Sequence, residues 1–189
     1  MQGQPSGLGQ LRGGAQFMSE PVNPHPLVGL ARESIASHLS GTPPPKPYSS
    51  GDATKAAGAF VSLKIAGKLR GCIGTIEPVR PTLAEEIMDN AVSAATRDPR
   101  FQPLTLDELS DVSISVDVLG TPESVSGLEG LDPSRYGVIV KSGTRKGVLL
   151  PDLPGITTSQ EQVRIARQKA GIGEGETVEL LRFEVKRYY

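Results

Sequence analysis

The 189-residue sequence has one cysteine, no tryptophan and only four phenylalanines and four tyrosines. The single cysteine, Cys72, excludes an internal disulfide and is typical of proteins from a reducing compartment. The shortage of aromatic rings argues against a platform that stacks nucleic-acid bases. No run of about 18 apolar residues occurs, so no membrane span is expected. No charged segment followed by an apolar one opens the chain, so we expect no secretory signal and a cytoplasmic location.

An excess of charge of one sign is also missing. Twenty Lys and Arg residues face 21 Asp and Glu residues, for a net charge of −1, whereas nucleic-acid-binding proteins usually carry a basic excess. We therefore expect neither nucleic acid nor a membrane as a partner. The only histidines, His25 and His38, do not combine with Cys72 in a metal-ligand spacing. Neither a phosphate-binding glycine loop nor a serine-nucleophile motif is found, so no metal or cofactor is predicted. Nothing here indicates an oligomeric state.

The chain is long enough for one domain or for two small lobes that share a core. Residues 1–20 are rich in Gly and Gln and have no apolar period, which predicts a flexible tail ahead of a domain over residues 21–189. Apolar residues at helical spacing predict a first helix from Pro26 to just before Gly41. The proline-rich stretch at 42–47 predicts an extended linker after it.

Alternating patterns further along predict strands, and capping signatures predict helices. Tight turns between apolar alternations indicate two antiparallel hairpins, at 58–75 and 136–151. Further strands are expected at 112–119 and at 177–189. Capping pairs predict further helices, with a short one after Thr105 and longer ones after Thr82 and Thr158. No internal repeat is visible. The pattern predicts an α+β (mixed α/β) fold with antiparallel or mixed sheets and three to four helices.

The stretch LRGCIGT, residues 69–75, raises the functional question. Strict alternation would place Arg70, Cys72 and Gly74 on one face of the strand, and the intervening Leu69, Gly71 and Ile73 on the other. A free cysteine is often a small core residue, so packing alone can account for Cys72. Three features favour a site: Arg70 would stabilise a thiolate, the glycines admit a ligand, and the strand ends beside a loop. No histidine is near, so a carboxylate would have to act as base: Glu77, Asp98 or Asp117.

A second cluster, RDPRF at 97–101, follows a predicted helix. It contains Arg97, Asp98 and Arg100. Solvated charges at a helix end are one interpretation. The other is a clamp for an anionic group next to Cys72. Together the two stretches give candidate catalytic residues and candidate binding residues: catalytic Cys72 and Glu77; binding Arg70, Gly71, Gly74, Thr75, Arg97, Asp98 and Arg100.

These motifs resemble the AMMECR-type domain family, whose prokaryotic members are called AmmeMemoRadiSam system protein A. LRGCIGT is similar to the family signature. DPRF and the segments YGVIVKSGTRKGVLLPDL and QVRIARQKAGI follow in the family's order. The likeness covers about residues 25–187. It implies a larger and a smaller α/β subdomain, and it implies a Memo-type protein and a radical SAM protein as partners.

Two functions remain open from the sequence. In one, the chain is a partner-binding module or system component that works with Memo-type and radical SAM proteins. In the other, it is an enzyme in which Cys72 is the nucleophile, Arg70 and Arg97 hold an anion and a nearby carboxylate moves protons. The absence of a visible base favours the first.

Overall fold

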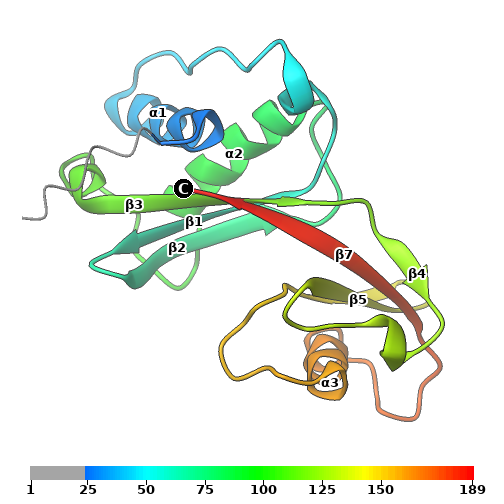
Figure 1. Cartoon of the computed structure of the whole chain (residues 1–189). Coiled ribbons are helices and arrows are strands. Elements are labelled where there is room, and N and C mark those ends of the chain that lie inside the picture. Colours follow the sequence, from blue (N-terminus) through cyan, green and yellow to red (C-terminus); the bar gives the residue numbers. More distant parts are fainter. Residues whose placement is uncertain (1–23) are drawn as a thin grey trace, which may run out of the picture.

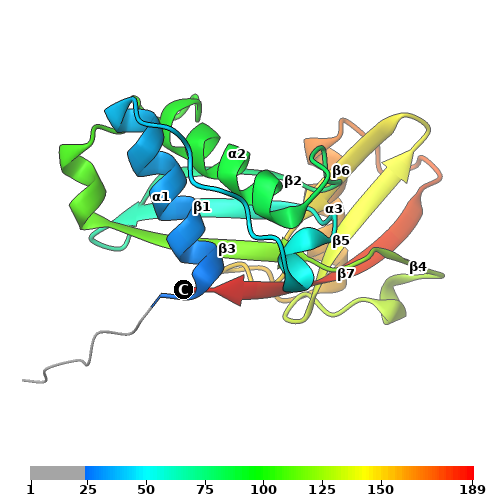
Figure 2. The same ribbon diagram turned by 90° about the horizontal axis from the view of Figure 1, so that it is seen from above.

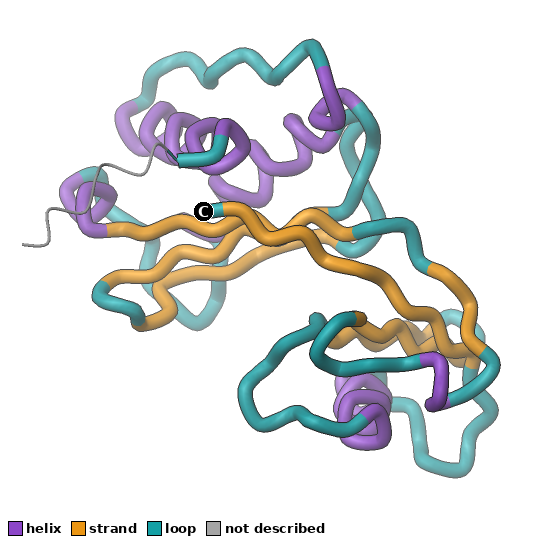
Figure 3. The backbone as a smooth tube through the Cα atoms, viewed as in Figure 1, coloured by secondary structure: helices purple, strands orange, loops and turns teal. Residues whose placement is uncertain are grey.

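The computed structural model describes residues 24–189, so the tail expected at residues 1–20 lies outside the described part of the chain. Figures 1 and 3 show the arrangement of the elements. The helices are α1 (Pro26–Ser40), α2 (Leu83–Thr96) and α3 (Ser159–Lys169). The strands are β1 (Ala59–Ile65), β2 (Lys68–Thr75), β3 (Val112–Leu119), β4 (Glu123–Val125), β5 (Tyr136–Ser142), β6 (Arg145–Leu149) and β7 (Glu179–Tyr188). Short 3₁₀ helices are η1 (Gly51–Thr54), η2 (Asp107–Asp111) and η3 (Leu128–Gly130).

One antiparallel sheet runs through the whole molecule, in the order β2-β1-β3-β7-β5-β6, with β4 also paired to β7. Strand β7 joins the two halves. Its last residues, 185–188, pair with β3, and residues 179–184 pair with β5. In Figure 1 this strand crosses from the upper layers to the lower right of the molecule. The two ends of β7 therefore belong to two different subdomains.

Three apolar clusters hold the layers together. In the larger subdomain, α1 and α2 cover one face of β1 and β3, with Ile35, Val61 and Ile87 fully buried (Figures 1 and 2). In the smaller one, α3 packs on β5 and β6 through Val163 and Ala166. A third cluster joins the remaining face of the small sheet to the side of β1 that the helices leave uncovered. Its members are Leu119, Ile139, Val148, Leu181 and Phe183, with Phe60, Ile76, Leu150 and Val185 packed against them.

The α+β fold with antiparallel pairing is confirmed, and so are the predicted helices, hairpins and strands. The short helix expected after Thr105 is the 3₁₀ helix η2. Between β3 and β5, where the sequence patterns predict no strand, the structure has the three-residue strand β4. Strand β4 is too short to show an alternation, and β7 supplies its hydrogen-bond partner. No helix in residues 24–189 is both long and apolar enough to cross a membrane.

A β-bulge corrects the predicted faces of β2. Leu63 pairs with Gly71 but Lys64 pairs with Leu69, so Arg70 is an extra residue on β2. Residues opposite each other on paired strands share a face. Leu69 therefore lies with Lys64, away from the helix-covered face that holds Gly71. Strict alternation was wrong at this point because a bulge breaks the two-residue period.

The structure also shows a repeated ββα unit that the sequence hides. Gly71, opposite Leu63, is matched in the second hairpin by Gly147, opposite Val140. A Cβ atom at Gly71 would lie 2.2 Å from the carbonyl oxygen of Ala94 on α2, and one at Gly147 would lie 1.8 Å from that of Ala166 on α3. Four residues before each alanine, the helix carries a buried side-chain amide, Asn90 in α2 and Gln162 in α3. Asn90 Nδ2 donates to the carbonyl of Ala59 at 3.0 Å, and Gln162 Nε2 donates to that of Tyr136 at 2.8 Å.

Both carbonyls belong to the first residue of a hairpin, so the two subdomains use one packing scheme. The bulge at Arg70 adds one residue to the first hairpin, which puts the two units out of register in the sequence. The amide also sits one turn later in α2 than in α3. It is eight residues after the N-cap residue Thr82 in one case and four after Thr158 in the other.

Candidate functional site

Cys72 lies in the middle of the edge strand β2 and is half-buried. It pairs with Ser62 on β1, and Ser62 pairs in turn with Ser115 on β3. The Ser62 hydroxyl donates to Cys72 Sγ at 3.2 Å. These three small polar residues form a row across the sheet on the face opposite α1 and α2. The thiol thus belongs to a sheet surface and is not enclosed in the helix-packed core.

Asp98 and Arg100 cover the open edge of β2 at Cys72. The Cys72 amide donates to Asp98 Oδ2 at 2.8 Å, and Arg100 Nη2 donates to the Cys72 carbonyl at 3.3 Å. Arg100 also donates to both oxygens of Asp98, at 2.9 and 2.7 Å. These bonds hold the pKa of the Asp98 carboxyl well below its usual range, chiefly through Arg100. The pair takes the place of a neighbouring strand, since it satisfies edge groups that would otherwise be open to another chain.

Arg70 is fully engaged on the same edge. Its Nε and Nη2 each donate to Glu108 at 3.0 Å, and Nη1 donates to the Gln102 carbonyl at 2.8 Å. Glu108 also accepts from the amide of Thr105 at 2.9 Å. The Arg70 guanidinium first, and then Thr105, lower the pKa of Glu108 to about 2. The bulged arginine therefore fastens the 97–108 segment to β2, and its guanidinium hydrogen-bonds to that segment instead of to the Cys72 sulfur.

The remaining candidate charges make other contacts. Glu77, which follows β2, forms an ion pair with Lys146 on β6, and this pair lowers the pKa of Glu77. It links the two edge strands and hence the two subdomains. Arg97 is the exposed C-cap residue of α2, and its amide donates to the Ser93 carbonyl at 2.8 Å. Asp117 pairs with Arg187 of β7 at 2.6 Å.

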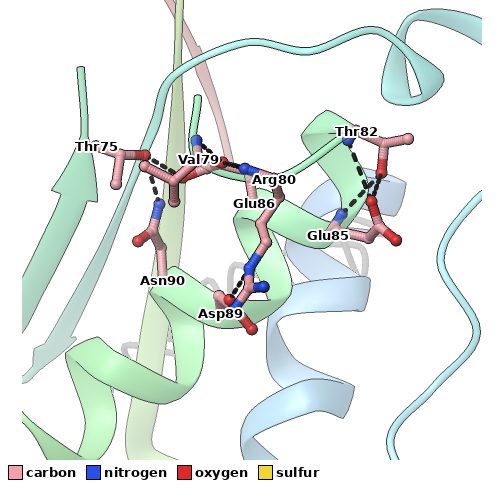
Figure 4. Close-up of polar contacts among 8 residues, drawn as sticks. All are labelled: Thr75, Val79, Arg80, Thr82, Glu85, Glu86, Asp89 and Asn90. Atoms are coloured by element: carbon pink, nitrogen blue, oxygen red, sulfur yellow. Dashed lines mark hydrogen bonds and ion pairs between the residues drawn. The ribbon is translucent and has the colours of Figure 1, made fainter. Parts of the chain in front are cut away.

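The end of β2 is anchored by a buried polar cluster (Figure 4). Thr75 donates through its hydroxyl to Glu86 Oε1, and Asn90 Nδ2 donates to Thr75 Oγ1 at 3.2 Å. Glu86 Oε2 accepts from the amides of Val79 and Arg80, each at 2.8 Å. Glu86 is completely buried, and Asn90 is 5% exposed. One hydroxyl and two backbone amides thus satisfy the buried carboxylate of Glu86, and these bonds fix the turn after the strand.

The two glycines of the motif have packing roles in the structure. A Cβ atom at Gly71 would meet α2, as described above. One at Gly74 would lie 2.2 Å from the ring of Phe60, which packs over the bare backbone. Gly71 therefore sets the distance between strand and helix, and Gly74 makes room for an aromatic ring of the junction cluster.

The structure thus brings Cys72, Asp98 and Arg100 together through the backbone of one residue, with Arg70 next to them. Sequence reasoning missed Ser62, Glu86 and Asn90. Ser62 follows from the hairpin register once the turn is placed. Glu86 and Asn90 are four residues apart on the apolar face of α2, where two polar residues signal buried hydrogen bonds. Within residues 24–189, no three His, Cys, Asp or Glu side chains are grouped so as to hold a metal ion.

The fold and this site define an α+β protein of two subdomains. Its LRGCIGT strand, β2, is a sheet edge whose backbone is hydrogen-bonded by Asp98 and Arg100. The AMMECR1 family model matches residues 28–188, and the chain belongs to that family. The expected family is therefore confirmed.

Relatives from bacteria and archaea support this assignment. A protein of Thermotoga maritima is 57% identical over 134 residues, which cover 70% of this chain and 77% of that protein. A protein of Clostridium acetobutylicum is 45% identical over 186 residues, 92% of this chain but only 38% of the longer relative. The crystal structure of an uncharacterised protein of Pyrococcus horikoshii superposes with a TM-score of 0.76 at 30% identity, covering 85% of this chain and 88% of that one.

Proposed function

We propose that this chain is a partner-binding module whose docking surface is the β2 edge and the two segments bound to it. The observation that carries the proposal is the state of the charged groups around Cys72. Asp98 is paired with Arg100, and Arg70 with Glu108. Acid–base or nucleophilic catalysis needs a group free to exchange a proton with the thiol. Here the charged side chains are instead hydrogen-bonded to each other and to backbone groups of β2 and the 97–108 segment, which favours a rigid surface.

The exposed apolar side chains favour the same surface. Among the described residues, five large hydrophobic residues are exposed, and three of them belong to β2 or its attached segments. Leu69 is 40% exposed on the strand, Val79 is 71% exposed in the turn that Glu86 fixes, and Leu106 is 49% exposed in the segment that Arg70 holds. Exposed apolar residues on a rigid support are typical of protein-binding sites.

The partners proposed are a Memo-type protein and a radical SAM protein, which the family resemblance implies. The test is a titration of the full chain with each purified protein by isothermal calorimetry. Val79→Ser and Leu69→Ser are expected to weaken binding about tenfold, because truncating an apolar anchor commonly costs more than 1 kcal/mol. Tyr189→Ser is the matched control. Tyr189 is 70% exposed but lies at the end of β7, three strands from β2.

The proposal would be contradicted if the parent protein bound neither of the two partner proteins. Equal weakening by Tyr189→Ser would also contradict it, because the effect would then not belong to the β2 surface. Melting curves of each variant separate lost contacts from lost folding.

The alternative is an enzyme that uses Cys72 as its nucleophile. The half-burial of Cys72 and the Ser62 hydroxyl at 3.2 Å from its sulfur favour it, since a reagent can approach and a hydroxyl can stabilise a thiolate. Alkylation by iodoacetamide across pH 5–9 separates the two functions. A nucleophile gives fast labelling that persists at pH 6, and a docking residue gives the slow labelling of an ordinary thiol.

A further inference from the structure

A second feature lies on the other face of the sheet, away from Cys72. A cavity of about 900 Å³ opens between the start of α1, the 48–57 segment that carries η1, and the strands β3 and β7. Figure 2 shows these elements side by side, with η1 above β7. Cavities of roughly 300–1,000 Å³ are typical of small-molecule sites. This one lies where β7 changes partner from β5 to β3, between Glu184 and Val185.

The walls combine an apolar floor with aromatic rings. Leu27, Leu83 and Val118 contribute buried or half-buried apolar surface. The chain has only four tyrosines and two histidines, and Tyr48, Tyr188 and His25 all line this cavity. The rings of His25 and Tyr188 pack with centroids 4.1 Å apart. Aromatic walls over an apolar floor favour a flat ring as the occupant.

Two acidic and two basic residues line the cavity: Asp52, Glu184, Lys55 and Lys186. Asp52 is paired with Lys55 at 2.8 Å, and Glu184 is paired at 2.8 Å with Arg135, which lies outside the lining. Lys186 has no ion-pair partner among residues 24–189, and its Nζ lies 5.2 Å from the centre of the Tyr188 ring. Lys186 is therefore the lining cation without a direct ion-pair partner in the described part of the chain. It lies beside the aromatic wall, near enough to Asp52 to help Lys55 lower the pKa of that carboxyl. An anionic group on a bound ring would pair with Lys186.

We propose that this cavity binds a small aromatic carboxylate. The ring lies on the floor formed by Leu27, Leu83 and Val118, and the carboxylate pairs with Lys186. This site is distinct from the docking surface, because Val118 and Lys186 pair on the helix-covered face whereas Cys72 lies on the opposite face. Binding here and binding of a protein partner at β2 can therefore be tested separately.

The test uses two probes that differ only in charge, 2-naphthoate and 2-naphthamide, titrated against the full chain and followed by their fluorescence. The parent is expected to bind one naphthoate saturably and to prefer it over naphthamide about fivefold, as a partly exposed ion pair provides. Lys186→Gln is expected to abolish that preference and to leave naphthamide binding unchanged. Lys68→Gln, at an exposed lysine of the β1–β2 hairpin, is the matched control and is expected to change neither.

Ala56→Trp is the blocking variant. Ala56 is exposed and lines the cavity, so an indole there fills the space without entering the core, and both probes are expected to lose binding. Three results would overturn the proposal. They are no saturable naphthoate binding by the parent, unchanged binding by Ala56→Trp, and a charge preference that survives Lys186→Gln. The parent would also show no saturable naphthoate binding if other residues of the chain occupied the cavity. Melting curves confirm that each variant is folded.

Discussion

The carbonyl oxygen of Ala94 on α2 lies where a side chain of Gly71 on β2 would begin, only 2.2 Å from an ideal Cβ position. Gly71→Ala must therefore push α2 away from the sheet. We expect a loss of roughly 1–3 kcal/mol in the free energy of unfolding, as overpacked cores show. Urea denaturation measures it. Parent-like stability would mean that α2 is not held at this distance.

Gly29→Ala is the matched glycine substitution, with the opposite expected sign. Gly29 is inside α1, and nothing lies within 4 Å of its ideal Cβ position. Alanine is the better helix former, so we expect a gain of about 0.5–1 kcal/mol in the same denaturation assay. A loss at this position would show that the two glycines do not differ as the contacts indicate.

Thr75 tests the buried cluster at the end of β2. Thr75→Val keeps the shape but removes the hydroxyl that Glu86 and Asn90 share. We expect a loss of about 1–3 kcal/mol, because a buried carboxylate loses one of its donors. Thr75→Ser keeps the hydroxyl and is expected to cost less than about 1 kcal/mol. Equal effects of the two variants would contradict the prediction, because Thr75→Ser keeps the hydroxyl that Thr75→Val removes.

Asp98 gives a pH-dependent prediction. Its pKa is lowered in the folded state, chiefly by Arg100, so its carboxylate stabilises the fold above the unfolded-state pKa of about 4. That contribution falls as the pH drops below about 4. We expect Asp98→Asn to be less stable than the parent at pH 7, with the difference narrowing towards pH 2.5. Urea midpoints at several pH values measure it. A difference that is constant with pH would mean that the carboxylate's charge contributes nothing.

Cys72 separates packing from chemistry. Because its side chain is half-buried and its sulfur accepts only a weak bond from Ser62, we expect Cys72→Val and Cys72→Ser to stay within about 1 kcal/mol of the parent. We also expect Cys72→Ser to bind the partner proteins as the parent does. Parent-like stability with loss of activity in a complementation assay, for both variants, would make Cys72 a chemical centre instead.

The sequence by itself determined the elements and the family. The helices follow from signals that lie within a few residues of one another, such as the Thr82–Glu85 capping box, which the structure forms. The hairpins follow from apolar alternation and tight turns, and LRGCIGT pointed to the family. Local patterns of this kind depend on backbone geometry and hydrogen bonds between near neighbours, so they can be read along the chain.

Only the tertiary structure decided what the signature residues contact. Glu108, the partner of Arg70, is 38 residues away along the chain, and Asp98, the partner of the Cys72 amide, is 26 residues away. From the sequence alone, the charges at 97–100 indicated a clamp for an anion. In the structure, the 97–108 segment is bound along the strand instead. The bulge at Arg70 leaves no mark in composition. The ββα repeat was hidden for the same reason, because single residues such as Gly71 and Gly147 become equivalent only when helix and sheet are packed. Contacts between distant residues are selected by the shape of the whole fold, which no local pattern records.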